Sequence, residues 1–333
     1  MSRRRPRSQR RSAHQRAIRP ALRGGINASP VVLPEGEFST LGQWAEHRFG
    51  RAGAAVFDGD IFYDFCQPAH ASDPYRPGVR VHIFRPVPDE PPQPILLDVV
   101  ERGERFVVVD KPHGIATIPR GSYVARSVTV AARRQFSNDD VAAAHRLDAE
   151  TAGLVLLTED PRWRGPYQDM FARRAVGKAY RAVAPAVDLE ALTTRLPGIV
   201  NGPDADGWIQ VDLFLTRSAG EISVRVEPGE PNSRTYIRKV RHIAAPNPAG
   251  SQPLALYEMR PITGRLHQLR ATLNHLGAPI TGDPLYPKVL SLEETAARAF
   301  PTQLLAAELS FVDPVDGEHV HIRTRRTLQF LTL

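Results

Sequence analysis

VAAAHRLDAETAGLVLLT, residues 141–158, is the stretch on which the predicted fold depends. It ends in the apolar run LVLL, residues 154–157, which shows no alternation. A short run of this kind fits a strand buried on both faces, although a buried helix segment has the same pattern. His145, Arg146 and Asp148 stand just before it, and a buried strand would not carry such side chains. We therefore expect a charged loop that holds Asp148 at the end of a core strand, where a catalytic group stays fixed and reachable.

The composition is typical of a globular protein with more than one folded unit. The chain has 333 residues, of which 42% are hydrophobic and 24% are charged. Cys66 is the single cysteine, which excludes an internal disulfide and favours a reducing cytoplasm. No run of about eighteen apolar residues occurs, so we expect no membrane partner.

The basic charge of the chain is concentrated at its start. Residues 1–24 contain nine arginines and no acidic residue, and the whole chain carries a net charge of +7, which leaves the remainder slightly acidic. A segment this poor in apolar residues is predicted to be disordered. Two interpretations stay open: an arm that holds polyanions without sequence choice, or a solubilising leader.

Proline marks the expected domain boundary. Residues 25–85 are predicted to form a small N-terminal accessory region, with a helix at 41–49 and a half-exposed strand within 78–84. This region is either an RNA-binding accessory or a structural extension. Residues 86–95 contain PVPDEPPQP and are predicted to be a linker, and residues 96–333 are predicted to form the catalytic domain.

The catalytic domain is predicted to be α+β, with a mixed, mostly antiparallel sheet flanked by helices and loops. Short connections between residues 186 and 253 leave no room for crossover helices, which favours antiparallel pairing. Expected strands are 106–109, 178–184, 208–214, 221–226, 236–243 and 254–260, and expected helices are 127–136, 165–174 and 265–276.

The last of these helices presents two faces. Leu266, Leu269, Leu273 and Leu276 recur at helical spacing and are predicted to face the core; His267, Arg270 and Asn274 form a polar stripe, and Gly277 is predicted to end the helix in a left-handed conformation. A cationic stripe would thus be fixed on a rigid helix.

Asp148 has several possible roles as an isolated residue. It could be a nucleophile, a general base, a metal ligand or a turn cap, and the cap is the better interpretation for a lone aspartate. A metal would need more ligands than His145 and Asp148, and Arg146 between them would repel a cation. A cationic helix and an aromatic at Tyr180 favour catalysis, because a carboxylate near guanidinium groups stays ionised and an aromatic ring can stack on a flipped-out base.

Five ordered segments carry a resemblance to a known family. HRLDAETAGLVLL resembles the catalytic motif of the RNA pseudouridine synthases of the RluA-type branch. FVVVDKPHGIATIPRG resembles the opening strand and turn of that family, KAYRAV its tyrosine motif, RPITGRLHQLRATLNHLGAPITGDPLYP its arginine motif and LLAAELSFVDPVDGE its closing strand. The resemblance covers roughly residues 97 to 320.

The resemblance implies a role for each matching residue. Asp148 would be the essential aspartate, Tyr180 would stack on the uracil and help take the proton from C5, Arg270 would pair with Asp148, and Arg146 would help open the RNA and fill the vacated space. It further implies a set of substrate-binding residues: His145, Arg146, Leu147, Thr151, Lys178, Thr263, Gly264, Arg265, His267 and Gln268.

The chain also departs from the family pattern at a few positions. Ala152 replaces a usual serine, Glu159 and Asp160 stand where a small residue and a lysine are common, and Thr272 replaces a usual histidine. None of these is a catalytic position, so the departures bear on RNA contacts and the choice of substrate.

The resemblance implies that uracil leaves its ribose, rotates and is rejoined through C5, without a cofactor or metal. Attack of the aspartate on ribose C1′, attack on C6 of the base, and removal of a C2′ proton to form a glycal are all compatible with the residues, and we favour the glycal. The implied partner is RNA, an rRNA or tRNA stem-loop, bound by a monomer without an obligate protein partner.

Two other functions fit parts of the pattern less well. An inactive RNA-binding or ribosome-assembly protein of the same fold is disfavoured by the intact Asp148, Tyr180 and Arg270. A metal-dependent phosphoesterase built on His145 and Asp148 lacks further ligands.

Overall fold

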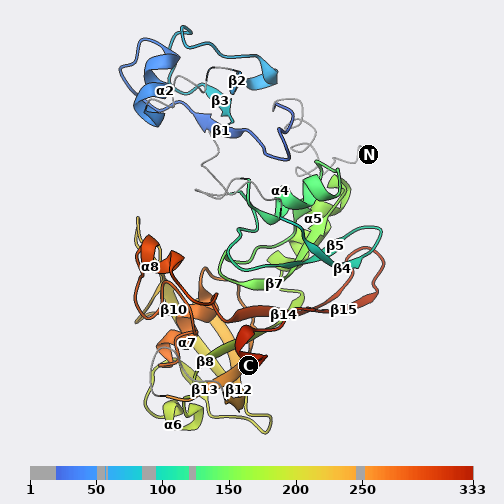
Figure 1. The fold of residues 1–333 in the computed structure, drawn as a ribbon, viewed down its shortest axis with the longest axis vertical. Coiled ribbons are helices and arrows are strands. Elements are labelled where there is room, and N and C mark those ends of the chain that lie inside the picture. Colours follow the sequence, from blue (N-terminus) through green and yellow to red (C-terminus); the bar gives the residue numbers. More distant parts are fainter. Residues whose placement is uncertain are drawn as a thin grey trace, which may run out of the picture. The chain divides into compact units, whose positions relative to one another are not determined.

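The computed structural model describes residues 20–50, 57, 59–84, 95–119, 125–244 and 252–332. Residues 1–19 of the predicted arginine-rich tail and residues 86–94 of the predicted linker lie outside these ranges. The chain divides into two compact units: Met1–Ile95 with Ile118–Asp139, and Leu96–Thr117 with Asp140–Leu333 (Figure 1). The segment Ile118–Asp139 thus groups with the front region, whereas the sequence placed it in the catalytic domain. The domain boundaries proposed from the sequence stay a prediction.

The first unit is built on a small antiparallel sheet. Its strands β1 (Ser29–Val32), β2 (Ile61–Tyr63) and β3 (Arg80–Ile83) lie in the order β1-β3-β2. Helix α2 (Leu41–Phe49) has the predicted bounds, and the Thr40 side chain caps it by accepting from the Gln43 N–H. Trp44 of α2 is buried with Ile61 and Val81 of the sheet. The unit also contains η1 (Asp64–Cys66) and α4 (Val128–Gln135).

The second unit is organised around one large sheet. Its main path runs β11-β10-β12-β13-β8-β14-β7-β5-β4, and β15, β6 and β9 pair with β14, β7 and β10 (Figure 1). Only the β14–β7 pair among the described strands is parallel, which confirms the predicted mostly antiparallel sheet. The strands are β4 (Asp98–Arg102), β5 (Val107–Lys111), β6 (Ala142–Ala143), β7 (Ala152–Thr158), β8 (Val176–Pro185), β9 (Ile199–Asn201), β10 (Ile209–Thr216), β11 (Arg225–Glu227), β12 (Ser233–Ile243), β13 (Leu254–Pro261), β14 (Leu304–Val312) and β15 (His319–Arg323). The helical elements are α5 (Pro161–Ala172), α6 (Leu189–Thr193), α7 (Gln268–His275), α8 (Leu292–Ala296) and η2 (Gln329–Leu331).

Strand β7 confirms the central sequence prediction. All of its residues are buried. Leu154 and Leu156 pack with α5 in one apolar cluster, and β5 and β14 pair with β7 on its two edges. The preceding loop is therefore held at the end of a strand that has no freedom to shift.

Helix α7 begins later than predicted. The sequence pattern favoured a helix from residue 265, but the helix starts at Gln268, and His267 before it has a left-handed backbone with φ 51°. The Gln268 side chain is the reason. Its Oε1 accepts from the Thr263 hydroxyl at 2.8 Å and from the Arg265 N–H at 3.0 Å, which ties the preceding residues into a turn. His267 is thus not part of a helical stripe, and the prediction was wrong at this point.

The end of α7 is as predicted. Gly277 has φ 75° and its N–H donates to the Asn274 carbonyl, while the Ala278 N–H donates to the Leu273 carbonyl. These two bonds form a Schellman motif, which satisfies carbonyls that the last turn leaves free.

Two other elements start four residues away from their predicted first residue. Helix α5 starts at Pro161 and not at residue 165, because the Asp160 side chain accepts from the Arg162 N–H and caps it. Asp160, one of the departures from the family pattern, therefore has a structural role. Strand β11 covers only Arg225–Glu227 of the strand expected from residue 221.

We predict that Gly153→Ala destabilises the second unit by at least about 2 kcal/mol, since a left-handed backbone and a blocked Cβ position both disfavour alanine. Gly153 has φ 111° in β7, and a Cβ there would collide with the Ala306 backbone of β14, including its nitrogen at 2.7 Å. Urea unfolding measures the change.

Gly165→Ala is the matched control. Gly165 lies inside α5, and no atom comes within 4 Å of the position that an added Cβ would take, so alanine should stabilise by about 0.5–1 kcal/mol. Equal unfolding midpoints for the two variants would contradict the close approach of β7 and β14.

Candidate active site

The loop that carries Asp148 is held by its backbone. The Thr117 hydroxyl donates to the Leu147 carbonyl at 2.8 Å and accepts from the Leu147 N–H at 2.9 Å. The Gly114 N–H donates to the Ala149 carbonyl, and His113 Nδ1 lies 2.8 Å from the Glu150 carbonyl. The turn that follows β5 thus fixes residues 147–150, which is the rigid presentation that the sequence predicted.

Lys111, at the end of β5, supports the same loop from inside. Its side chain is fully buried, and its Nζ donates to the carbonyls of Pro112, Ile115 and Ala149 at 2.9–3.1 Å. Burial lowers the pKa of Lys111 to about 7, and the charge of Asp148 opposes that shift. Three carbonyl acceptors require three N–H donors, so the geometry corresponds to the ammonium form.

The Asp148 carboxylate faces two side chains of the arginine motif. Its Oδ2 lies 3.8 Å from Nη1 of Arg270 and 3.9 Å from Nε2 of His267, and its side chain is 23% exposed. The predicted approach of Arg270 to Asp148 is thus present at ion-pair distance. Neither group lies within hydrogen-bond distance of Oδ2, so this oxygen stays open to a substrate.

Arg270 has a closer partner that the sequence analysis did not identify. Nε of Arg270 donates to Oδ2 of Asp283 and Nη2 donates to Oδ1, both at 2.6 Å. Arg270 and Asp283 are both buried, with side chains 2% and 0% exposed. Burial alone would disfavour the guanidinium charge, but Asp283 and then Asp148 raise the pKa of Arg270. The cation beside Asp148 is therefore permanent.

Tyr180 comes to the site from β8. Burial, and after it the negative charge of Asp148, raises the pKa of the Tyr180 phenol. The hydroxyl consequently stays protonated at neutral pH. The aromatic ring packs at the margin of the core formed by β8, β13 and α7.

His267 is neutral in this surrounding. Burial and the nearby Arg270 charge lower the pKa of His267 to about 4, although Asp148 and Asp283 act in the opposite direction. Its Nδ1 lies 3.4 Å from the Tyr286 hydroxyl. At pH 7 the imidazole can therefore give or take a hydrogen bond without adding charge.

His145 was expected from the resemblance to bind substrate, but its ring is engaged in contacts within the fold. Its ring stacks on Phe171 at 4.2 Å, and its Nε2 accepts from the Leu156 N–H at 3.1 Å. Burial, and then Lys178, lowers the pKa of His145 to about 3, so the ring is neutral. It braces the end of β7 against α5.

The other expected substrate-binding residues divide between surface and interior. Arg146 is exposed, whereas Leu147 and Thr151 are buried. Lys178 precedes Tyr180 by two residues on β8. The Thr263 hydroxyl donates a hydrogen bond to the Gln268 side chain. Gln268 Nε2 in turn donates to the Arg234 carbonyl and the Thr235 hydroxyl. Gly264 has open space around it, and Arg265 Nε donates to the Asn232 carbonyl.

A second network that sequence reasoning missed anchors Glu150. Its Oε2 accepts from Nη1 of Arg298 at 2.9 Å and from the Thr302 hydroxyl at 2.8 Å. Burial raises the pKa of Glu150, but these donors outweigh it and leave the pKa lowered. The sequence offered one signal for this network: Glu150 is an acidic residue two positions after Asp148, in a loop predicted to be rigid.

The ligands that a metal-dependent reaction requires do not come together around Asp148. The described part of the chain contains no group of three or more His, Cys, Asp or Glu side chains that could hold a metal ion. Within the same residue ranges, no helix is both long and apolar enough to cross a membrane.

Comparison with known proteins agrees with the family expected from the motifs. A family model described as RNA pseudouridylate synthase matches residues 105–275. A dual-specificity RNA pseudouridine synthase RluA from Vibrio parahaemolyticus is 29% identical over 67% of this chain and 81% of its own length. A ribosomal large subunit pseudouridine synthase D from Xanthomonas campestris is 26% identical over 93% of this chain and 88% of its own length.

The solved structure of human RNA pseudouridylate synthase domain containing 1 has the same fold, with a TM-score of 0.52 and 24% identity over 71% of this chain and 86% of that one. The chain belongs to the RNA pseudouridine synthase family, in its RluA-type branch. It is thus an isomerase that acts on RNA.

We predict that Arg270→Ala lowers the free energy of unfolding by about 3–5 kcal/mol, because it leaves the buried Asp283 carboxylate without its partner. A loss of turnover in this variant would then be accompanied by a loss of folded protein. Asp148→Asn is the control: Asp148 is partly exposed and its contacts are near 4 Å, so its stability should stay within about 1 kcal/mol of the wild type. Urea unfolding of both variants at pH 7 distinguishes them, and equal losses would contradict the dominance of the Arg270–Asp283 pair.

We also predict that His145 contributes to a pH-dependent stability, in addition to His267, whose pKa is lowered as well. The folded pKa of His145, about 3, is below the unfolded value near 6.5, so the unfolded chain binds more protons between these values. The contribution of His145 to stability is therefore full above about pH 6.5 and falls as the pH decreases, by roughly 1–2 kcal/mol between pH 6.5 and 5.

His145→Gln keeps an acceptor for the Leu156 N–H but cannot titrate, so its unfolding free energy should change less with pH in this window. Urea unfolding at several pH values tests this. Parallel curves for the variant and the wild type would show that His145 does not contribute.

Proposed function

We propose that the protein converts uridines in a structured RNA, an rRNA or tRNA stem-loop, to pseudouridine with Asp148 as the catalytic carboxylate. The observation that carries this proposal is the position of Asp148: it lies on a loop fixed by backbone bonds, with an open carboxylate 3.8 Å from a buried, permanently charged Arg270. A carboxylate that must act as a nucleophile or base has to stay ionised, and an adjacent guanidinium favours that form.

The reaction breaks the bond between N1 of uracil and C1′ of ribose and forms a bond between C5 and C1′. The C5 proton is lost and N1 gains one, so no oxidant or co-reactant is consumed. Asp148 would start the reaction either by attacking carbon or, on the glycal route that we favour, by removing the C2′ proton. Nη1 of Arg270, held by Asp283, would keep the carboxylate oriented throughout.

Of the two roles implied for Tyr180, stacking on the uracil is better supported than removal of the C5 proton. The raised pKa of its phenol means that the resting hydroxyl carries its proton. It could take the C5 proton only after giving up its own, whereas a planar ring stacks on uracil in either state. Lys178 precedes it on β8 and is suited to contact the phosphate of the same nucleotide.

The names of two relatives support a proposal for the RNA that is modified. The names of the two bacterial relatives refer to a dual-specificity enzyme and to the large ribosomal subunit. We propose a target among the large-subunit rRNA and tRNA anticodon stem-loops, modified by a single chain in the cytoplasm without a cofactor. The first unit, with its own core, would be an RNA-binding accessory or a structural extension.

We predict that Asp148→Asn abolishes pseudouridine formation, with RNA binding kept or tightened, because the change removes a charge and leaves the shape. Pseudouridines are mapped in total RNA from cells that lack the gene and from the same cells complemented with wild type or variant. A modification that returns with wild type but not with the variant supports the proposal and identifies the target.

Residual turnover of the purified variant within about tenfold of wild type, about 1.4 kcal/mol of barrier, would remove Asp148 from its assigned role. Activity that disappears after exhaustive chelation would contradict the cofactor-free reaction. A wild type that binds RNA and modifies none would support the inactive RNA-binding alternative.

A further inference from the structure

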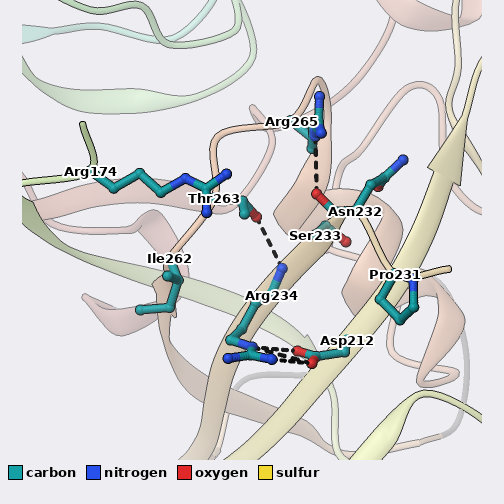
Figure 2. A pocket seen from close by; sticks show the side chains of 9 residues that line it. All are labelled: Arg174, Asp212, Pro231, Asn232, Ser233, Arg234, Ile262, Thr263 and Arg265. Carbon is teal, nitrogen blue, oxygen red and sulfur yellow. Dashed lines mark hydrogen bonds and ion pairs between the residues drawn. The ribbon is translucent and has the colours of Figure 1, made fainter. Parts of the chain in front are cut away.

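A pocket of about 580 Å³ lies next to the turn that precedes α7, outside the catalytic contacts. Its lining comes from the turn between α5 and β8, from β10, from the start of β12 with the residues just before it, and from the turn that follows β13. It contains three arginines and one acidic residue (Figure 2). The pocket shares Thr263 and Arg265 with the turn that leads to His267 and so to Asp148. The pocket and the candidate active site are therefore connected by one turn.

The acidic residue of the pocket is already neutralised. Arg234 donates from Nε to Oδ1 of Asp212 at 3.0 Å and from Nη2 to Oδ2 at 2.7 Å. These bonds are drawn in Figure 2. Two positive charges therefore remain, those of Arg174 and Arg265.

Arg265 is partly engaged and Arg174 is not. Arg265 uses Nε on the Asn232 carbonyl, which leaves its two terminal nitrogens directed elsewhere. Among the residues that the structure describes, no side-chain hydrogen bond or ion pair involves the Arg174 guanidinium. Figure 2 shows this side chain extending into the pocket from a different segment than Arg265.

The backbone of Arg174 is unusual for an arginine. It has φ 59° directly after α5, where its N–H donates to the Phe171 carbonyl and the Ala175 N–H donates to the Met170 carbonyl. This is the helix-ending position at which glycine is preferred, and a residue with a Cβ adopts it at a cost of about 1–2 kcal/mol. An arginine at this position aims its charge into the pocket at the expense of stability, as is common at functional sites.

A second cation stands beside Arg174 without a counterion. Lys178 follows on β8, and burial and then the positive charge of Arg174 lower the pKa of its ammonium. No hydrogen bond or ion pair to this ammonium occurs within the described ranges of the chain. An anion in the pocket would relieve the repulsion between the two cations.

We propose that this pocket binds a backbone phosphate of the RNA strand next to the target uridine, and that Arg174, together with Arg265, makes the contact. The inference rests on the proposed RNA substrate and adds a specific anchor for the flanking nucleotides. Lys178 and Tyr180 continue from the anchor along β8 to the catalytic carboxylate, so the strand would be held on one side of the nucleotide that leaves the stack.

The test compares Arg174→Asn with Arg173→Asn. Asparagine tolerates the left-handed backbone of Arg174, so the fold should be kept. Arg173 is the adjacent exposed residue and does not line the pocket, so its variant loses the same charge elsewhere. Dissociation constants are measured across a range of salt concentrations with unmodified transcripts of large-subunit rRNA and of tRNA.

For Arg174→Asn we expect an increase in Kd of about tenfold at low salt, and a slope of log Kd against log salt that is smaller by about 0.7–0.9, the value for one phosphate contact. Arg174→Lys should recover most of the slope, because a point charge releases the same counterion.

Equal Kd values and slopes for Arg174→Asn and Arg173→Asn would overturn the proposal. So would a loss of inorganic phosphate binding in Arg174→Asn while RNA binding is unchanged, since the pocket would then serve a small anion. Both readouts measure binding and need no turnover. A wild type that forms no pseudouridine would contradict the proposed function and leave this comparison intact.

Discussion

The arrangement of the site depends on one charge that has no access to water. Arg270 is 2% exposed, and a guanidinium in that position must find its counterion inside the fold. Asp283 accepts hydrogen bonds from Nε and Nη2 of Arg270, both at 2.6 Å. These bonds determine where the remaining nitrogen, Nη1, can point. Arg270 is consequently not free to swing onto Asp148 and close a two-pronged pair with it. The Asp148 carboxylate receives the field of the cation and keeps its oxygens available.

Three other titratable side chains at or near the site are uncharged at neutral pH. His267 and His145 are neutral at pH 7 because burial lowers the pKa of each. The Tyr180 phenol keeps its proton because burial raises its pKa. The electrostatics around Asp148 therefore change little over the physiological pH range, apart from the buried Lys111 beneath the loop.

Much of this was accessible from the sequence, where the signal is local. An unbroken apolar run predicts β7, and leucine spacing and Gly277 predict the body and the end of α7. The approach of Arg270 to Asp148 was expected only from the resemblance to the family. The strand and the helix end depend only on neighbours along the chain.

What the sequence analysis missed depends on side chains that meet from distant segments. The start of α7 is displaced because the Gln268 amide bonds to Thr263 and to the β12 backbone, and no helical pattern encodes that competition. Asp283 stood within a recognised motif, but its role emerges only when it is seen to neutralise a buried arginine. Lys111 likewise shows its function through carbonyls of Ile115 and Ala149.

The position of β14 has a consequence for how the protein is made. Strands β7 and β8 are neighbours in sequence and bring Asp148 and Tyr180 to the site, yet β14, residues 304–312, lies between them in the sheet. Chains fold as they emerge from the ribosome, N-terminal segments first. A nascent chain that already displays both residues cannot space them correctly until β14 has also been translated and has left the exit tunnel. The spacing between Asp148 and Tyr180 is therefore set only after residues 304–312 have been synthesised.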